Sequence, residues 1–390
     1  MPWHHGSIVL RLLALLALSE FVRTGFFVPF LPLHAKSIGL TAAGIGWIVG
    51  LHYLADGLTK GPAGVLAERI GLGRIALAGA LMGTVAVVLV PYVPSVLPAV
   101  LMTVAWGLTI TTLWPSVMTA VSYFAKEGKQ SRALSWASVA AAPAIGLGIV
   151  GVGLLMQRVP AVAYPVLVGA QIAALLVAFS LVGLRLPRTS KQAQPYRWAR
   201  VAVLIPAAFA QTLAPGLLVT IFYPYLRALN VSIVELLLPG LLAVLVGLVG
   251  IPLAGRLADR GHPRRALLPG LMLLATTFAL LGTEGIAGKL WVVAPVAGLA
   301  YALFLTGWNG LVARTLPQEH RTAAWGTIMA IEALGYAVGP VLGGFAWDRF
   351  GMQGPFWLGA LVFALVQVYY LLPWQERSRD AQKNKNTSVL

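Results

Sequence analysis

The chain contains a succession of apolar stretches, each long enough to cross a lipid bilayer as a helix of about 20 residues. Of its 390 residues, 58% are hydrophobic and only 10% are charged, whereas about 25% of a soluble domain is charged. The predicted spans are residues 8–33, 43–66, 74–92, 97–122, 132–156, 162–186, 200–226, 232–255, 266–284, 290–315, 322–346 and 353–374. The sequence therefore predicts an all-α membrane protein with twelve transmembrane helices.

The basic residues lie mostly in the loops on one side of these predicted spans. If both termini are cytoplasmic, 22 of the 28 Lys and Arg residues fall in cytoplasmic segments, five lie outside, and Arg23 lies within the membrane. This distribution follows the positive-inside rule and predicts cytoplasmic N- and C-termini. It explains the net charge of +16 without a nucleic acid partner, and it predicts attraction to anionic membrane lipids.

Several kinds of chemistry lack a sequence signature here. The chain has no cysteine and its six histidines show no metal-ligand spacing, so we predict no disulfide, metal or cofactor. It also lacks HExxH, GxSxG and Walker A motifs, which argues against an enzyme and against direct use of ATP. Concentrative transport by such a chain would have to use an ion gradient.

The two halves of the chain resemble each other at offsets of 189 to 195 residues. The repeated pairs are FFVPFL and IFYPYL, GVLAERIGLGR and GRLADRGHPRR, TLWPS and TGWNG, and RALSW and RTAAW. Each pair occupies matching positions in the first and second sets of six spans. Repeats of this kind are typical of secondary transporters, whose substrate site lies between the halves.

A polar stretch, RLPRTSKQAQPYRWAR, separates the two sets of spans. We therefore predict two pseudo-symmetric six-helix bundles. The predicted boundaries are an N-terminal bundle at 1–186, a cytoplasmic linker at 187–199, a C-terminal bundle at 200–374 and a cytoplasmic tail at 375–390.

The loops after the second and eighth spans carry the pattern G-x-L-A-D/E-R, followed by further basic residues. The pattern resembles the loop signature of the major facilitator superfamily, and the resemblance covers the whole chain. It implies the two-bundle fold of that family and transport by alternating access.

These loops also predict a cytoplasmic gate. A carboxylate at the inner end of one helix can meet the positive N-terminus of a helix in the other half. We expect Glu68 to meet the helix start near Arg321, and Asp259 to meet the start near Arg132. The predicted gate comprises Gly64, Glu68, Arg69, Gly255, Asp259, Arg260, Arg132 and Arg321. The alternative is that the loop charges only enforce topology.

Charged residues also occur inside the predicted membrane spans. Glu20 and Arg23 are three residues apart in the first span, and His52 and Asp56 share a face of the second. Intramembrane charges usually mark a transport pathway or site. Because its charge balance changes with one proton, a Glu–Arg–Asp cluster suits a proton-coupled carrier.

We therefore predict that these four residues form one proton-coupling and headgroup site. Glu20 is our choice for the acid that takes the transported proton. Two alternatives stay open: Glu20 and Arg23 could be only a structural ion pair, and His52 could be a satisfied polar residue rather than a proton relay.

The C-terminal half offers less charge at the matching positions. Pro215 and Leu218 stand where the first half has Glu20 and Arg23, and the eighth span has no counterpart of Asp56. The remaining polar candidates for substrate binding there are Gln211, Asn309 and Glu332. A cavity that is charged on one side and apolar on the other suits an amphiphile, whose headgroup and acyl chains need different surroundings.

The E-x-x-R pattern of the first span, with an aspartate 36 residues after the glutamate, resembles the proton-coupled glycolipid flippases that export the lipoteichoic-acid anchor. The resemblance implies a headgroup site in the N-terminal half. Glu20, Arg23 and Asp56 match this group, and Trp114 and Trp136 match it approximately. An indole can stack on a pyranose ring and donate its N–H to a hydroxyl.

Other transporter classes stay open as alternatives. A proton-coupled efflux antiporter for drugs or small solutes is the second interpretation, followed by a sugar or organic-anion carrier, and then a membrane enzyme or receptor. The fourth span lacks the arginine usual in multidrug antiporters, and their G-x-x-x-G-P-x-x-G-G motif occurs here in the eleventh span as GYAVGPVLGG. We expect a monomer in the bacterial cytoplasmic membrane that carries a lipid or glycolipid in exchange for protons.

Overall fold

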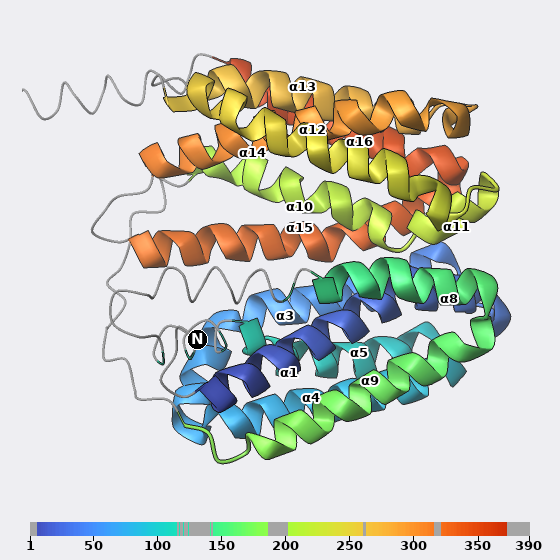
Figure 1. Cartoon of the computed structure of the whole chain (residues 1–390), viewed down its shortest axis with the longest axis vertical. Coiled ribbons are helices and arrows are strands. Elements are labelled where there is room, and N and C mark those ends of the chain that lie inside the picture. The colour runs from blue at the N-terminus through green and yellow to red at the C-terminus, as the bar shows by residue number, and fades with distance from the viewer. Residues whose placement is uncertain are drawn as a thin grey trace, which may run out of the picture. The chain divides into compact units, whose positions relative to one another are not determined.

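In the computed structural model, all regular secondary structure of the described residues is helical (Figure 1). The structure describes residues 6–114, 117, 120, 124, 141, 143–185, 202–259, 263–315 and 321–372. Within these helices, the side chains of residues 36, 60–68, 252, 258–259, 313–314 and 321–327 are outside the description.

The helices group into two compact units. The first unit comprises Met1–Gln192, Pro215–Val234 and Ala333–Met352, and the second comprises Ala193–Ala214, Glu235–Glu332 and Gln353–Leu390. Three of the described helices therefore have residues in both units. The sequence-based boundaries at 186 and 200 stay a prediction.

The helices of the first half are α1 (Gly6–Gly25), α2 (Leu31–His34), α3 (Ala42–Ile70), α4 (Leu72–Leu89), α5 (Val96–Ile110), α8 (Val152–Arg158) and α9 (Pro160–Ser180). Those of the second half are α10 (Ile205–Val219), α11 (Phe222–Ala228), α12 (Ile233–Asp259), α13 (Arg264–Leu281), α14 (Leu290–Thr315), α15 (Arg321–Phe350) and α16 (Gly354–Leu371). Among the described residues, eight helical stretches are long and apolar enough to cross a membrane, and two shorter apolar helices accompany them. The count of twelve spans, the two six-helix bundles and the cytoplasmic termini stay predictions.

The first span is continuous but contains a wider turn. Between α1 and α2, Phe26–Phe30 form a π-helical turn in which the amide of Leu31 donates to the carbonyl of Phe26. Pro29 lies inside this turn and has no amide proton for a regular α-helical bond. Turns of this kind add one residue to a helix and often occur near functional sites.

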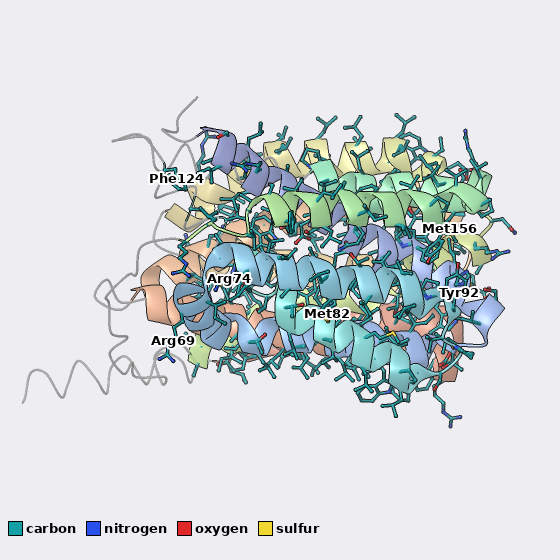
Figure 2. All side chains as sticks on the ribbon, turned by 90° about the horizontal axis from the view of Figure 1, so that it is seen from below. Arg69, Arg74, Met82, Tyr92, Phe124 and Met156 are labelled. Carbon is teal, nitrogen blue, oxygen red and sulfur yellow. The ribbon has the colours of Figure 1, made fainter. Side chains whose placement is uncertain are left out.

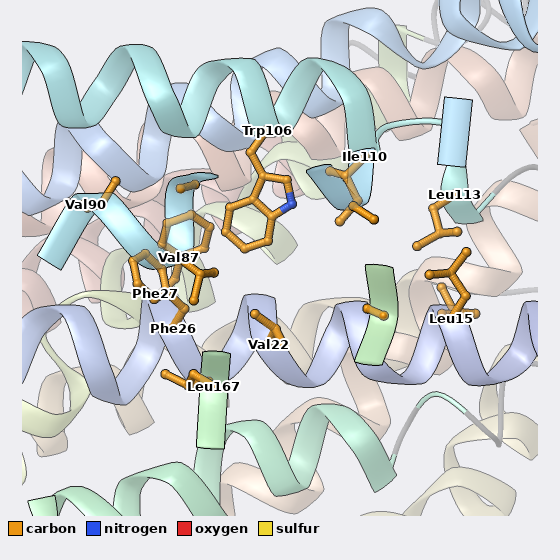
Figure 3. Packing of buried hydrophobic residues seen from close by; sticks show 14 of the residues in the cluster. Leu15, Val22, Phe26, Phe27, Val87, Val90, Trp106, Ile110, Leu113 and Leu167 are labelled. Atoms are coloured by element: carbon orange, nitrogen blue, oxygen red, sulfur yellow. The ribbon is translucent and has the colours of Figure 1, made fainter. Parts of the chain in front are cut away.

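Aromatic and branched side chains fill the core of the first unit. Phe26 and Phe27 of the π-turn pack with Trp106 of α5, and Val87 and Val90 lie beside them (Figure 3). All five are essentially inaccessible to solvent. The π-turn is therefore held on one side by aromatic packing in this unit's core.

The ends of the first unit's helices alternate as antiparallel membrane helices require. Arg69 and Arg74, on either side of the α3–α4 turn, lie at the same end as Phe124, and Tyr92 and Met156 lie at the opposite end (Figure 2). Gly71 joins α3 to α4 with φ of 107°, in the left-handed region that glycine adopts most readily.

The second unit has its own core. In this unit α13 packs against α14 and α16 (Figure 1). The ring of Phe363 on α16 contacts Phe278 of α13 and Phe304 of α14, with centroids 5.5 and 6.4 Å away. The hydroxyl of Tyr370 donates to the carbonyl of Val203 at 2.8 Å, which fixes α16 to the start of α10.

Candidate substrate and proton site

Glu20 and Arg23 lie on the same face of α1, one helical turn apart. The Nη2 atom of Arg23 donates to both carboxylate oxygens of Glu20 at 2.8 Å. Glu20 is only 2% exposed, so its charge is compensated almost entirely by protein groups. A buried ion pair of this kind costs desolvation energy that its Coulombic attraction only partly returns, which makes it poor evidence for a purely stabilising role.

Asp56 of α3 is the second acid of the cluster. Its Oδ2 atom lies 3.4 Å from Nη1 of Arg23, and the residue is buried. The guanidinium therefore bridges acids on two helices, and the structure brings together the three charged residues singled out in the sequence.

Trp114, four residues beyond the end of α5, completes the surroundings of Glu20. Its indole Nε1 donates to Oε1 of Glu20 at 2.7 Å. The carboxylate thus accepts bonds from two donor groups, one of them a permanent cation. While this contact holds, the indole N–H is not free to bind a sugar hydroxyl. Trp136, the other expected stacking residue, lies outside the described residues.

The guanidinium of Arg23 has a third nitrogen, Nε. Its Nε atom is buried and has no acceptor among the described residues. A guanidinium presents its donors in a fixed planar geometry, so this N–H has a defined direction. An unpaired buried donor is costly unless a ligand or water completes it.

Two tyrosines, Tyr53 and Tyr336, belong to this site although the sequence analysis did not select them. The guanidinium carbon of Arg23 lies 5.4 Å from the ring centroid of Tyr53, within the range of a cation–π contact. Tyr53 in turn stacks on Tyr336 of α15, with centroids 5.7 Å apart and an interplanar angle of 29°. A signal for Tyr53 existed, since it is one turn before Asp56 on the same helix.

His52 lies one turn before Asp56 on α3 and is fully buried. Its Nδ1 atom lies 2.8 Å from the carbonyl oxygen of Thr103 on α5. Since a carbonyl can only accept, Nδ1 carries the proton. The ring packs against Phe27 and Trp106, with centroids 4.7 and 5.0 Å away.

The candidates of the second half form a separate, smaller arrangement. In the second unit, Nε2 of Gln211 on α10 donates to Oε1 of Glu332 on α15. Both side chains are half-buried, whereas Asn309 of α14 is exposed. The structure thus joins two of the three predicted polar residues.

Most of the predicted cytoplasmic gate cannot be compared with the structure. Arg132 and Arg260 lie outside the described residues, as do the side chains of Glu68, Asp259 and Arg321, and Gly64 lies within α3. Arg69 is exposed at the end of α3, and Gly255 is half-buried on α12. The two carboxylate–helix contacts stay predictions.

Comparison with known protein families identifies the family to which this chain belongs. The family model described as Major Facilitator Superfamily matches it twice, over residues 13–223 and 204–389. The chain belongs to the major facilitator superfamily. The double match agrees with the internal repeat seen in the sequence.

Sequence relatives of this superfamily member include a transporter of known type. The present chain is 23% identical over 384 residues to the proton-coupled antiporter flippase LtaA of Staphylococcus aureus (strain USA300), and the match covers 94% of each chain. LtaA of strain N315 is also 23% identical, over 383 residues. These matches agree with the resemblance to proton-coupled flippases inferred from the charged residues.

Solved structures agree on the fold. The nucleoside transporter NupG superposes with a TM-score of 0.73 at 11% identity, covering 93% of this chain and 98% of NupG. A bacterial homolog of the human lysosomal transporter Spinster, inward-facing and occupied, gives 0.72 at 17% identity over 95% and 97% of the two chains. The protein is therefore a multi-pass transporter of the cell membrane with the superfamily fold.

Proposed function

We propose that this transporter moves an amphiphilic lipid, a glycolipid, across the membrane by proton-coupled alternating access. The observation that supports the proposal most directly is the buried cluster of Glu20, Arg23 and Asp56, with Trp114 bonded to Glu20. Charged residues this deep in a membrane protein are expensive and are usually kept for a pathway or a site.

The cluster has a donor for the headgroup. The Nε–H of Arg23 has no acceptor among the described residues, and the guanidinium keeps its charge at all working pH values. An oxygen-rich headgroup, whether carbohydrate or phosphate, would supply the missing acceptor. A hydrocarbon or a cationic group would not.

The cluster can also couple transport to protons. With both acids ionised, two carboxylates and one guanidinium leave one negative charge, and a single proton neutralises them. A neutral cluster costs less to keep in a low-dielectric environment than a charged one, so a bound proton favours the state from which the headgroup has left. Binding of a proton and binding of the headgroup then alternate at one place, as antiport requires.

The two halves differ in polarity as an amphiphile would require. Among the described residues, both buried acids, Glu20 and Asp56, and buried His52 belong to the first half. The buried polar residues of the second half are the threonines Thr212, Thr220 and Thr277. We therefore assign the headgroup to the first half and the acyl chains to the second.

Proteoliposomes test the proposal. With the wild-type protein, a fluorescent glycolipid should flip faster when a pH gradient is imposed. With the Arg23→Ala variant, the gradient should have no effect on the rate of flipping. Saturating cationic drug should not compete. If cationic drugs are carried against the gradient and the glycolipid is not, the protein is instead a drug antiporter, the second interpretation. If neither moves, both are wrong.

A further inference from the structure

We propose that His52 is a positioning residue, a neutral clamp that fixes the helix carrying Asp56 to α5, and that it does not carry the transported proton. The proposal rests on the function proposed above for Glu20, Arg23 and Asp56. It assigns to His52 a role that neither its charge nor its place in the sequence would indicate.

The clamp belongs to a regular seam between α3 and α5. Thr103 and Gly107 of α5 and Thr111, which directly follows it, lie at intervals of four residues, so they share one helix face. The Oγ1 atom of Thr103 lies within hydrogen-bond distance of three carbonyls, those of Ala99 and Val100 on its own helix and that of Ile48 on α3 at 3.1 Å. One turn further along α3, the carbonyl of Thr103 accepts the bond from His52.

The seam continues to Asp56. The carbonyl oxygen of His52 lies so close to Gly107 that a Cβ atom there would overlap it, which allows the two helices to approach closely. The Oγ1 atom of Thr111 donates to the backbone carbonyl of Asp56 at 2.5 Å. Asp56 therefore stands at the end of a row of contacts between α3 and α5 to which His52 contributes a side-chain hydrogen bond.

The surroundings of His52 do not fit a proton relay. A relay needs a donor and an acceptor within hydrogen-bond reach. Nδ1–H is taken by a backbone carbonyl, and Nε2 has no partner among the described residues. The titratable groups that act on the ring are Arg23 of α1 and, on α3, Tyr53 and Asp56, whereas the described part of α5 presents a carbonyl and an indole.

Loss of the clamp should act through Asp56. Without the bond to Thr103, α3 is free to rotate or slide on α5 by a fraction of an ångström. The contact between Asp56 and Arg23 is 3.4 Å long, so a small shift changes it substantially. The effect should be a slower transport cycle with the proton dependence of the acids unchanged.

Three substitutions separate a clamp from a carrier. In His52→Asn the amide nitrogen lies close to the place of Nδ1 and can still donate to Thr103. In His52→Gln the amide lies closer to the place of Nε2, and His52→Phe fills the aromatic pocket without a donor. None of the three can titrate.

We expect His52→Asn to keep gradient-driven glycolipid transport within about twofold of wild type, whereas His52→Gln and His52→Phe lose about tenfold, the factor expected for a lost buried hydrogen bond. The midpoint of the pH profile should be the same in all four proteins. If all three variants lose gradient-driven transport but keep downhill exchange, or if the midpoint moves, His52 carries the proton. If none of the three variants differs from wild type, His52 is neither a clamp nor the proton carrier.

The result for the wild-type protein shows whether a failure concerns the proposed function or the role of His52. If wild-type protein shows no gradient-driven transport, the proposed function fails, and thermal unfolding of the same four proteins in detergent decides about the clamp. A clamp predicts that His52→Asn unfolds near the wild-type temperature and that His52→Phe unfolds about 2 °C lower. Equal unfolding temperatures for these two variants would overturn it.

Discussion

Tyr53 of α3 stacks on Tyr336 of α15 next to the guanidinium of Arg23. Through this pair, the charged cluster contacts a helix from the other half of the sequence. The same two helices pack closely nearby, because Gly50 approaches the carbonyl of Ala337 too closely for any side chain. The charged cluster therefore lies next to a close contact between α3 and α15.

We expect Tyr53→Ala to lower the rate of glycolipid transport severalfold, because it removes both the cation–π contact, worth about 1 kcal/mol, and the stack on Tyr336. Tyr53→Phe keeps both ring contacts and is the matched control. Rates in proteoliposomes check this prediction, and equal rates for the two variants would show that the aromatic contacts have no role.

The contact between α3 and α15 should open during transport. The chain is free of cysteine, so two cysteines can be introduced without a background reaction. Trp47 and Phe345 face each other across these helices, with centroids 6.4 Å apart. A short thiol cross-linker between Trp47→Cys and Phe345→Cys should stop transport, and the single variants should stay active after the same treatment. Full activity of the cross-linked protein would mean that this contact is static.

Trp114 should act through its N–H rather than through its ring. Trp114→Phe keeps an aromatic ring but removes the donor to Glu20, so we expect at least a tenfold loss, corresponding to about 1.5–3 kcal/mol for a bond to a charged group. Trp114→His, which can donate again, should recover part of the rate. If Trp114→Phe transports normally, stacking on the headgroup is the better explanation of this residue.

Arg23 and its two acids should respond unequally to neutralisation. Arg23→Ala leaves Glu20 and Asp56 buried without their cation, so transport should be lost at every gradient. Arg23→Lys keeps the charge but loses the planar fork, and we expect partial activity.

Glu20→Gln and Asp56→Asn should each lose dependence on the pH gradient while keeping the fold. If all the neutral variants keep full gradient-driven transport, the cluster is structural.

The second half, to which we assign the acyl chains, should tolerate fewer polar substitutions than the first half, to which we assign the headgroup. Leu218→Asn on α10 places a polar group in the half whose buried polar residues are threonines among those described. We expect slower transport of a long-chain glycolipid with unchanged binding of the isolated headgroup, measured by isothermal titration. A matched Leu218→Ile variant controls for shape. Equal loss of both activities would contradict the assignment of the acyl chains to the second half.

Much of the site could be predicted because buried charge is rare in a membrane chain. Glu20, Arg23 and Asp56 stand out against an apolar background, and helical spacing puts the first two on one face. Tyr53 and Tyr336 could not be selected this way, because tyrosines are common in membrane helices and the stack depends on how α3 and α15 cross. The same holds for the α3–α5 seam, where His52 and two threonine hydroxyls meet backbone carbonyls beside a glycine. The repeat in the sequence indicated a secondary transporter and the loop signature its family, but neither indicated which side chains would touch.

The π-turn at Phe26–Phe30 sets the angular phase of the first span. One residue in an α-helix corresponds to about 100° of rotation, so the extra residue turns the face bearing Glu20 and Arg23 by that angle relative to α2. The matching motif in the seventh span has no such turn, since α10 ends at Val219 and α11 begins anew at Phe222. Equal numbering from the two motifs therefore does not give equal directions in space. Deleting a single residue from this turn would leave every charge present and aim the binding face at a different neighbour.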